Sequence, residues 1–150
     1  MTRPLGARIA VLASGLGSAM AQAACLAVAT PADGTTLATL EAVAFDVVYA
    51  HSVTRTPVVE HYLLDGRGLR QTSMRFREHG PGLPTEADAG QSFTRTADEF
   101  VVTLDRRFER IVMRVHADQS PRLVAAGTTL DLARWGNRAL ELRAAPCAAH

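Results

Sequence analysis

Short runs of Val, Leu, Thr and Phe alternate along the chain with Gly, Pro and Asp at close intervals. This pattern is typical of strands joined by tight turns. No window shows the sustained 3.6-residue apolar period, capped at both ends, that would predict an α-helix. The predicted strands are Cys25–Thr30, Thr35–Ala42, Phe45–Val53, Val58–Leu64, Leu69–Arg77, Phe100–Leu104, Arg110–His116, Thr129–Trp135 and Ala139–Ala144.

The residues between these runs have the chemistry of turns. Pro31–Gly34 is predicted to join the first two strands, and Asp65–Gly68, which contains an Asp-Gly pair, the fourth and fifth. Gly136 and Asn137 are predicted to turn the last hairpin. Many short antiparallel strands with regular turns predict an all-β fold, which is either a single antiparallel β-sandwich or a partly open barrel.

Alternation along two of the strands assigns their faces. Ile111, Met113 and Val115 fall on one face of their strand and are predicted to be core residues. Arg75 and Arg77 fall on the opposite face from the apolar residues of theirs and are expected in water.

The first 23 residues have the features of an export signal. Two arginines precede an apolar stretch over residues 9–20, and Ala21-Gln22-Ala23 fits an A-x-A cleavage motif. The apolar stretch is shorter than the roughly 20 residues that span a bilayer. We therefore expect a signal peptide at 1–23 and an exported, periplasmic β-domain at 24–150, with no transmembrane helix in the mature chain.

The charge of the mature chain argues against two classes of partner. Without residues 1–23 it has 14 Arg, no Lys and 15 acidic residues, a formal charge of −1. This composition forms neither the basic surface of a nucleic-acid-binding protein nor a polybasic membrane patch. Nucleic acid is therefore not expected as a partner.

Two cysteines remain after cleavage, Cys25 and Cys147, near opposite ends of the mature chain. An even pair in an exported protein indicates one disulfide bond. The alternative is a lipid anchor at Cys25, which Gln22 disfavours because a lipidation signal usually has an apolar residue at that position.

The hairpin formed by the third and fourth strands carries the main candidate site. If residues 54–57 form a four-residue loop, His51 lies opposite Glu60 and Tyr49 lies opposite Tyr62. Directly opposed side chains have Cβ atoms about 5 Å apart, so His51 and Glu60 would be within hydrogen-bonding reach. A histidine–carboxylate pair on an apolar face could orient a ligand, relay a proton or help to hold a metal. The structural alternative is a cross-strand pair that only fixes the register of the two strands.

Nucleophilic catalysis at this hairpin is disfavoured. Ser52 points to the face opposite His51, because neighbouring residues of a strand diverge. The chain also has no G-x-S-x-G motif, which marks many serine hydrolases.

A loop rich in Gly and Pro follows the fifth strand and contains His79, Gly80 and Gly82. Such a loop can bring its backbone close to an anion or a carboxylate, or it can be a plain crossover. If it folds over the hairpin, His79 could join His51 and Glu60. These residues, together with His61, do not have the spacing of a known zinc motif, so no metal or cofactor is predicted.

Part of the chain resembles a known family. The pattern Phe45-x-x-x-Tyr49-x-His51-Ser52-Val53, then Pro57-Val58-x-Glu60, then the Gly80–Pro84 loop is similar to a bacterial family of small exported proteins of unknown function. Genes of that family often lie beside, or are fused to, those of the membrane subunits of tripartite ATP-independent periplasmic (TRAP) transporters of the TAXI subclass. The resemblance covers residues 43–83 and implies a location and a neighbour, but no catalytic residue.

Three hypotheses about function follow. The first is a non-catalytic periplasmic accessory or binding module of a TRAP-type transporter, which contacts the membrane subunit or a small solute. Its ligand-binding residues would be Tyr49, His51, Glu60, Tyr62, His79, Gly80 and Gly82. The second is a small metal-dependent or acid/base enzyme that uses the His51–Glu60 pair. The third is a structural envelope protein.

Overall fold

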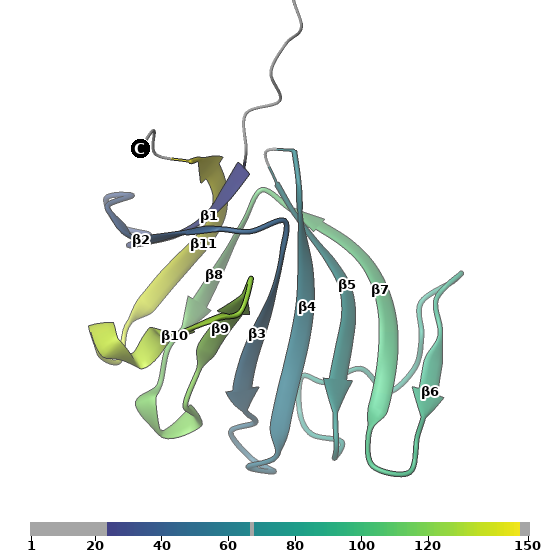
Figure 1. Ribbon diagram of the computed structural model, residues 1–150. Helices are drawn as coiled ribbons and strands as arrows, with labels where there is room; N and C mark the ends of the chain where they lie inside the picture. The colour runs from purple at the N-terminus through teal and green to yellow at the C-terminus, as the bar shows by residue number, and fades with distance from the viewer. Residues whose placement is uncertain (1–23, 67, 148–150) are drawn as a thin grey trace, which may run out of the picture.

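Two antiparallel sheets of unequal width pack face to face in the computed structural model, which describes residues 24–66 and 68–147. The small sheet contains, in spatial order, β2 (Thr36–Glu41), β1 (Ala24–Ala29), β11 (Ala139–Pro146) and β8 (Arg110–Arg114). The large sheet contains, in spatial order, β10 (Thr128–Asp131), β9 (Arg122–Ala125), β3 (Ala44–Ala50), β4 (Pro57–Asp65), β5 (Gly68–Phe76), β7 (Phe100–Phe108) and β6 (Phe93–Arg95). Figure 1 shows the large sheet fanning from β10 to β6, with β1, β2 and β11 gathered at one side of it.

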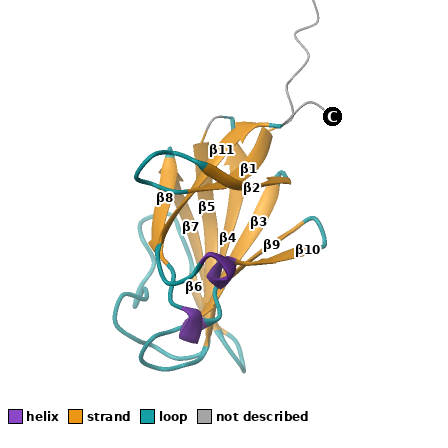
Figure 2. Ribbon diagram, turned by 90° about the vertical axis from the view of Figure 1, so that its left-hand side faces the viewer, coloured by secondary structure: helices purple, strands orange, loops and turns teal. Residues whose placement is uncertain are grey.

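This arrangement confirms the predicted all-β fold and takes the form of a β-sandwich. Two short 3₁₀ helices, η1 (Ala117–Gln119) and η2 (Leu132–Trp135), lie below the small sheet (Figure 2). The chain first passes from the large sheet to the small one at Glu109, between β7 and β8, and does so again between β10 and β11. The predicted signal peptide at 1–23 lies outside the described residues.

Each of the nine predicted strands overlaps an observed strand. The strands β6 and β9 were not predicted, because they have only three and four residues. The predicted strand over Thr129–Trp135 is wrong in its second half, which is η2. The hairpin predicted at Gly136 and Asn137 is also wrong, because β10 pairs with β9 whereas β11 pairs with β1 and β8.

The predicted turns and faces elsewhere are confirmed. The strands β1 and β2 pair across the turn that contains Pro31–Gly34, and β4 and β5 pair as far as Asp65 and Gly68. Val115 is fully buried, and Ile111 and Met113 pack against the core from the same face of β8. The side chains of Arg75 and Arg77 are exposed, as alternation predicted.

The large sheet carries two separate apolar clusters on its inner face. The first lies between the sheets and contains Phe45, Tyr62, Leu123 and Leu142 among others. The second is smaller and lies under the connection from β5 to β6, whose Leu83 packs against residues such as Val58, Phe76 and Val102 of the sheet. The small sheet thus covers one part of the large sheet and a loop covers another.

A disulfide bond between Cys25 and Cys147 confirms the predicted pairing. It joins the start of β1 to the residue that follows β11, and these two strands are neighbours in the small sheet. A disulfide indicates an oxidising compartment, which is compatible with export. Over residues 24–66 and 68–147, no helix has the length and hydrophobicity that a membrane crossing requires.

Candidate functional site

The β3–β4 hairpin has a different register from the predicted one. Ala50 pairs with Pro57, and the residue opposite Glu60 is Val47. The predicted cross-strand pair of His51 and Glu60 is therefore wrong, since β3 ends before His51. The loop of the hairpin contains six residues, His51 to Thr56, instead of four.

His51 lies in this loop because its side chain bonds to the backbone. Its Nδ1 accepts hydrogen bonds from the N–H groups of Val53 and Thr54, both at 3.2 Å. Its Nε2 lies 3.0 Å from the carbonyl oxygen of Pro81 and donates to it. Since Nδ1 accepts and Nε2 donates, the ring is the neutral Nε2–H tautomer. His51 is buried and joins the hairpin loop to the Gly/Pro loop, which is a structural role.

Gly80 is where the Gly/Pro loop contacts the hairpin. A Cβ atom at this position would lie 2.4 Å from Cε1 and 2.8 Å from Nε2 of the His51 ring. Only glycine therefore lets the two segments come this close. Gly82 has a different role, because it is exposed and adopts a φ of +87° in the turn. The loop does fold onto the hairpin, but it does so at His51 and not at Glu60.

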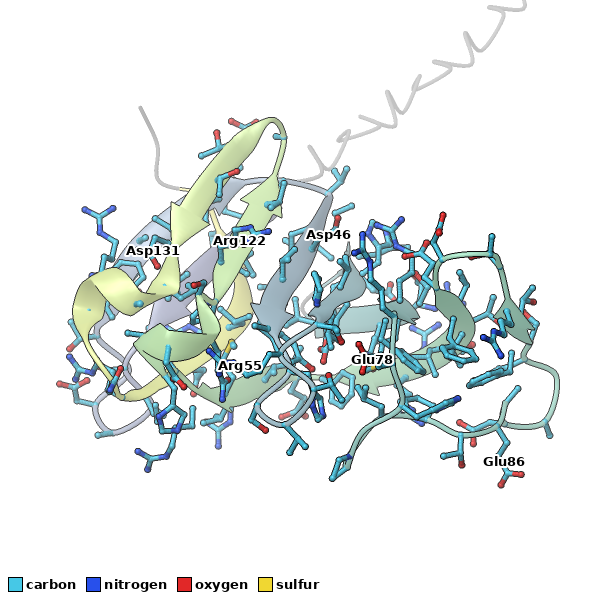
Figure 3. The ribbon with its side chains drawn as sticks, turned by 90° about the horizontal axis from the view of Figure 1, so that it is seen from below. Asp46, Arg55, Glu78, Glu86, Arg122 and Asp131 are labelled. Carbon is cyan, nitrogen blue, oxygen red and sulfur yellow. A yellow bond between two sulfur atoms is a disulfide. The ribbon has the colours of Figure 1, made fainter. Side chains whose placement is uncertain are left out.

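His79 lies in an aromatic cluster at the other side of this loop. Its ring centroid is 4.2 Å from that of Phe100, 5.6 Å from that of Phe76 and 5.9 Å from that of Phe93. Figure 3 shows the surrounding connection, with Glu78 at its start. The structure thus does not bring His79 together with Glu60.

Glu60 is instead surrounded by the two other polar residues predicted for its face. The Tyr49 hydroxyl donates to Oε1 of Glu60 at 2.8 Å, and the Tyr62 hydroxyl donates to Oε2 at 2.5 Å. The Gln71 amide donates to Oε2 at 3.5 Å. Tyr49 and Tyr62 are the chain's only tyrosines, so every phenol of the protein bonds to one carboxylate.

The surroundings keep both phenols protonated. Burial raises the pKa of Tyr49 far above its ordinary value of 10, and the charge of Glu60 and the hydrogen bond to it raise it further. The same causes, in the same order, raise the pKa of Tyr62, while the charge of Arg106 lowers it slightly. Both hydroxyls are therefore hydrogen-bond donors at any physiological pH.

These three residues line a cavity of about 190 Å³ between the sheets. The lining residues are Val47, Tyr49, Glu60 and Tyr62 from the large sheet, Ile111, Met113 and Arg114 from β8, and Gln119 and Pro121 from the connection between β8 and β9. A cavity of about 150 Å³ can hold a benzene molecule, so this one accommodates roughly six to eight non-hydrogen atoms.

The connection that contributes Gln119 is bound to the tip of the hairpin. Arg55, labelled in Figure 3, donates to Oδ2 of Asp118 at 3.2 Å and to the carbonyl oxygen of the same residue at 2.7 Å. Because Asp118 precedes Gln119, these bonds hold one wall of the cavity against the β3–β4 loop.

A second hollow, of about 320 Å³, lies near the turn between β4 and β5. Two of its charged lining residues, Asp65 and Arg107, form an ion pair with each other and already satisfy one another. The cavity at Glu60 is therefore the stronger candidate site, because its carboxylate has hydrogen-bond donors but, among the described residues, no cationic nitrogen within 4.0 Å.

Several residues of the cavity were not predicted as site residues. Ile111 and Met113 were assigned to the core from alternation, and their inward direction was the available signal. Gln119 and Pro121 lie outside the regular strands, so no periodicity could place them. Gln71 reaches Glu60 because β5 has an irregular register between Gln71 and Ser73, which a sequence pattern does not reveal.

The described residues give no support to a metal site. Among residues 24–66 and 68–147, no group of three or more His, Cys, Asp and Glu side chains could hold a metal ion. His61 lies on the opposite face of β4 from Glu60 and pairs with Asp46 through Nδ1 at 2.6 Å.

The fold and site define a β-sandwich protein with a small, partly open cavity, in which a carboxylate lies between two tyrosines. The chain belongs to the family described as Domain of unknown function (DUF1850), whose model matches residues 45–132. That match contains every residue that lines the cavity. Neither the curated proteins nor the solved structures include a significant match to the chain.

Proposed function

We propose that this protein is a non-catalytic, exported binding module that holds a small solute in the cavity at Glu60. The observation that carries the proposal is the set of bonds from Tyr49 and Tyr62 to the Glu60 carboxylate inside a cavity that opens between the sheets. Apolar walls with a few convergent polar groups are characteristic of small-molecule sites. The cavity is smaller than those that bind drug-sized ligands, so the solute is of metabolite size.

Export and a transporter partner belong to the same proposal. The disulfide supports an oxidising compartment, and the signal-like residues 1–23 support export. The resemblance to proteins encoded beside TAXI-type TRAP transporters supports the membrane subunit of such a transporter as the partner. The module would then present or retain solute beside the transporter.

The enzyme hypothesis loses its basis in this geometry. It required His51 and Glu60 to act together, but the His51 ring is fully engaged with backbone groups of the hairpin and the Gly/Pro loop. The experiment below distinguishes a structural envelope protein, which would retain no solute, from the proposed binding module.

Two substitutions on neighbouring positions of β8 test whether the cavity binds a solute. Met113→Trp fills the cavity, whereas Val112→Trp places the same side chain on the opposite face, where Val112 is 54% exposed. The full-length gene is expressed with export, and the purified protein is examined by native mass spectrometry for retained small molecules.

We expect the wild type and Val112→Trp to retain a solute and Met113→Trp to lose it while unfolding at a similar urea concentration. Equal retention by all three proteins, or no retained solute in any, would count against a cavity that binds solute. A pull-down from membranes with the same three proteins identifies the transporter subunit separately.

A further inference from the structure

We propose that the cavity selects a solute with a protonated primary amine, which binds to Glu60. This inference rests on the proposed function and names the chemistry of its ligand. It follows from the charge, the free acceptor positions and the shape of the cavity.

The surroundings of Glu60 favour a cationic ligand. Among the described residues, no Lys, Arg or His nitrogen lies within 4.0 Å of its carboxylate, although eight such ion pairs form elsewhere. Arg106, which acts on Tyr62 through its charge, is bound to Asp88 at 3.3 Å. The Glu60 carboxylate is therefore partly buried without a cation beside it.

A buried carboxylate elsewhere in the same domain shows the contrast. Glu141 is 3% exposed, and its two oxygens are bound by Arg110 at 3.5 Å and Arg143 at 3.4 Å. A buried charge without a partner is costly, which is why such groups are usually paired. Around Glu141 two arginines contact the carboxylate, whereas around Glu60 the corresponding space is part of the cavity.

Glu60 also has free acceptor positions. An ionised carboxylate offers about four lone-pair positions, of which Tyr49 fills one on Oε1, and Tyr62 and Gln71 donate to Oε2. The remaining positions need hydrogen-bond donors, and an ammonium group supplies three donors and no acceptor. A carboxylate ligand would bring no donor and would be repelled by the charge of Glu60.

The lining of the cavity also suits an aliphatic amine. The rings of Tyr49 and Tyr62 line it beside the carboxylate. Val47, Ile111 and Met113 provide apolar walls for an alkyl chain. Arg114 also lines the cavity, so a ligand with a second positive charge is disfavoured, and one with a carboxylate at its far end is tolerated.

Four small molecules of similar length test this selectivity. They are n-butylamine, 4-aminobutyrate, n-butyrate and n-butanol, all of which fit a cavity of this size. The protein expressed from the full-length sequence is labelled with ¹³C-tyrosine, and each compound is titrated at pH 7 while the NMR signals of Tyr49 and Tyr62 are followed. Because the chain has no other tyrosine, these signals report on the cavity alone.

We expect n-butylamine, 4-aminobutyrate or both to shift the tyrosine signals and to bind at least tenfold more tightly than n-butyrate and n-butanol. Comparing the two amines shows whether the solute is a simple amine or an amino acid. Glu60→Gln should reduce amine affinity at least tenfold, while Glu78→Gln, a matched change at an exposed glutamate, should leave it unchanged.

Preference for n-butyrate or n-butanol would overturn the inference and leave the solute-binding cavity standing. The absence of any shift with both amines would also overturn it, and the Met113→Trp comparison then decides the proposed function independently. The comparison of the four compounds uses only the wild-type protein, so it remains decisive if Glu60→Gln does not fold.

Discussion

Replacing Gly80 by Ala tests whether close contact between the Gly/Pro loop and His51 stabilises the fold. The added Cβ would lie 2.4 Å from Cε1 of the ring, so the ring or the loop has to move. Overpacking of this kind costs about 1–3 kcal/mol. Moving the ring also weakens its bonds to Val53, Thr54 and Pro81, each of which contributes about 0.5–1.5 kcal/mol. We therefore expect Gly80→Ala to lower the free energy of unfolding by about 2–3 kcal/mol.

The assay is urea denaturation followed by fluorescence of Trp135, the only tryptophan, which packs against the core between the sheets. With a urea dependence of about 1–3 kcal/mol per molar, the expected loss lowers the midpoint by roughly 1 M. Gly82→Ala is the control, because Gly82 has a φ of +87° and no atom within 4 Å of an added Cβ. Its cost of about 1–2 kcal/mol comes from backbone strain and does not involve His51.

A double-mutant cycle isolates the contact. If the His51 ring is what the new methyl group meets, adding Gly80→Ala to a His51→Ala protein should cost at least 1 kcal/mol less than adding it to the wild type. The Gly82→Ala substitution should cost the same in both backgrounds. Additive effects of His51→Ala and Gly80→Ala would refute the reasoning, because they would show that the two residues do not meet.

Three further predictions concern other parts of the molecule. Tyr49 and Tyr62 should show no ionisation near pH 10 in the folded protein, measured by absorbance at 295 nm. Because folding raises their pKa values, the stability they contribute is complete below pH 10 and is lost above it. Ionisation of both tyrosines near pH 10 without unfolding would contradict this. Replacing both Cys25 and Cys147 by Ser should lower the free energy of unfolding, measured in urea, by about 4–5 kcal/mol, because the disulfide bond closes a separation of 122 residues. A loss under 1 kcal/mol would show that the disulfide bond does not constrain the unfolded chain. Arg55→Ala should lower the free energy of unfolding by less than about 1 kcal/mol in the same measurement, since the ion pair of Arg55 is exposed. A loss above 2 kcal/mol would show that the hairpin tip contributes more to stability than its contacts indicate.

The sequence predicted the fold because alternation and turn residues are local signals. The Asp-Gly turn between β4 and β5 and the inward positions of β8 could be assigned without knowing what they pack against. The strand β9 lacked such a signal, since its four residues begin with an exposed Arg122 and form a strand by pairing with β3 and β10. Pairing partners that are distant in sequence are not encoded in a local pattern.

The β3–β4 hairpin shows why the sheet face of each residue was predicted better than its cross-strand partner. The true register of β3 and β4 differs from the predicted one by four residues, an even number. Because side chains alternate with a period of two, an even shift changes every partner but leaves every residue on its face. Tyr49, Glu60 and Tyr62 therefore share a face as predicted, while His51 loses its predicted partner. Besides its bonds within the hairpin loop, His51 is held by Pro81, 30 residues away, and no pattern in the hairpin could reveal that contact.

The position of Glu60 follows from the unequal widths of the two sheets. Along the inner face of β4, Glu60 lies between Val58, which belongs to the cluster under the Gly/Pro loop, and Tyr62, which belongs to the core between the sheets. A carboxylate in the middle of either cluster would have no access to a partner, whereas at the boundary between them it faces the cavity. Filling this boundary with an apolar residue would join the two cores and close the site. Glu60→Leu removes the acceptor of the Tyr49 and Tyr62 hydroxyls, and a buried donor left unsatisfied costs about 1–3 kcal/mol. If the carboxylate serves only stability, the variant should be destabilised by about this much and keep its solute. A folded Glu60→Leu protein that loses its solute would show that the carboxylate is kept at this boundary for binding.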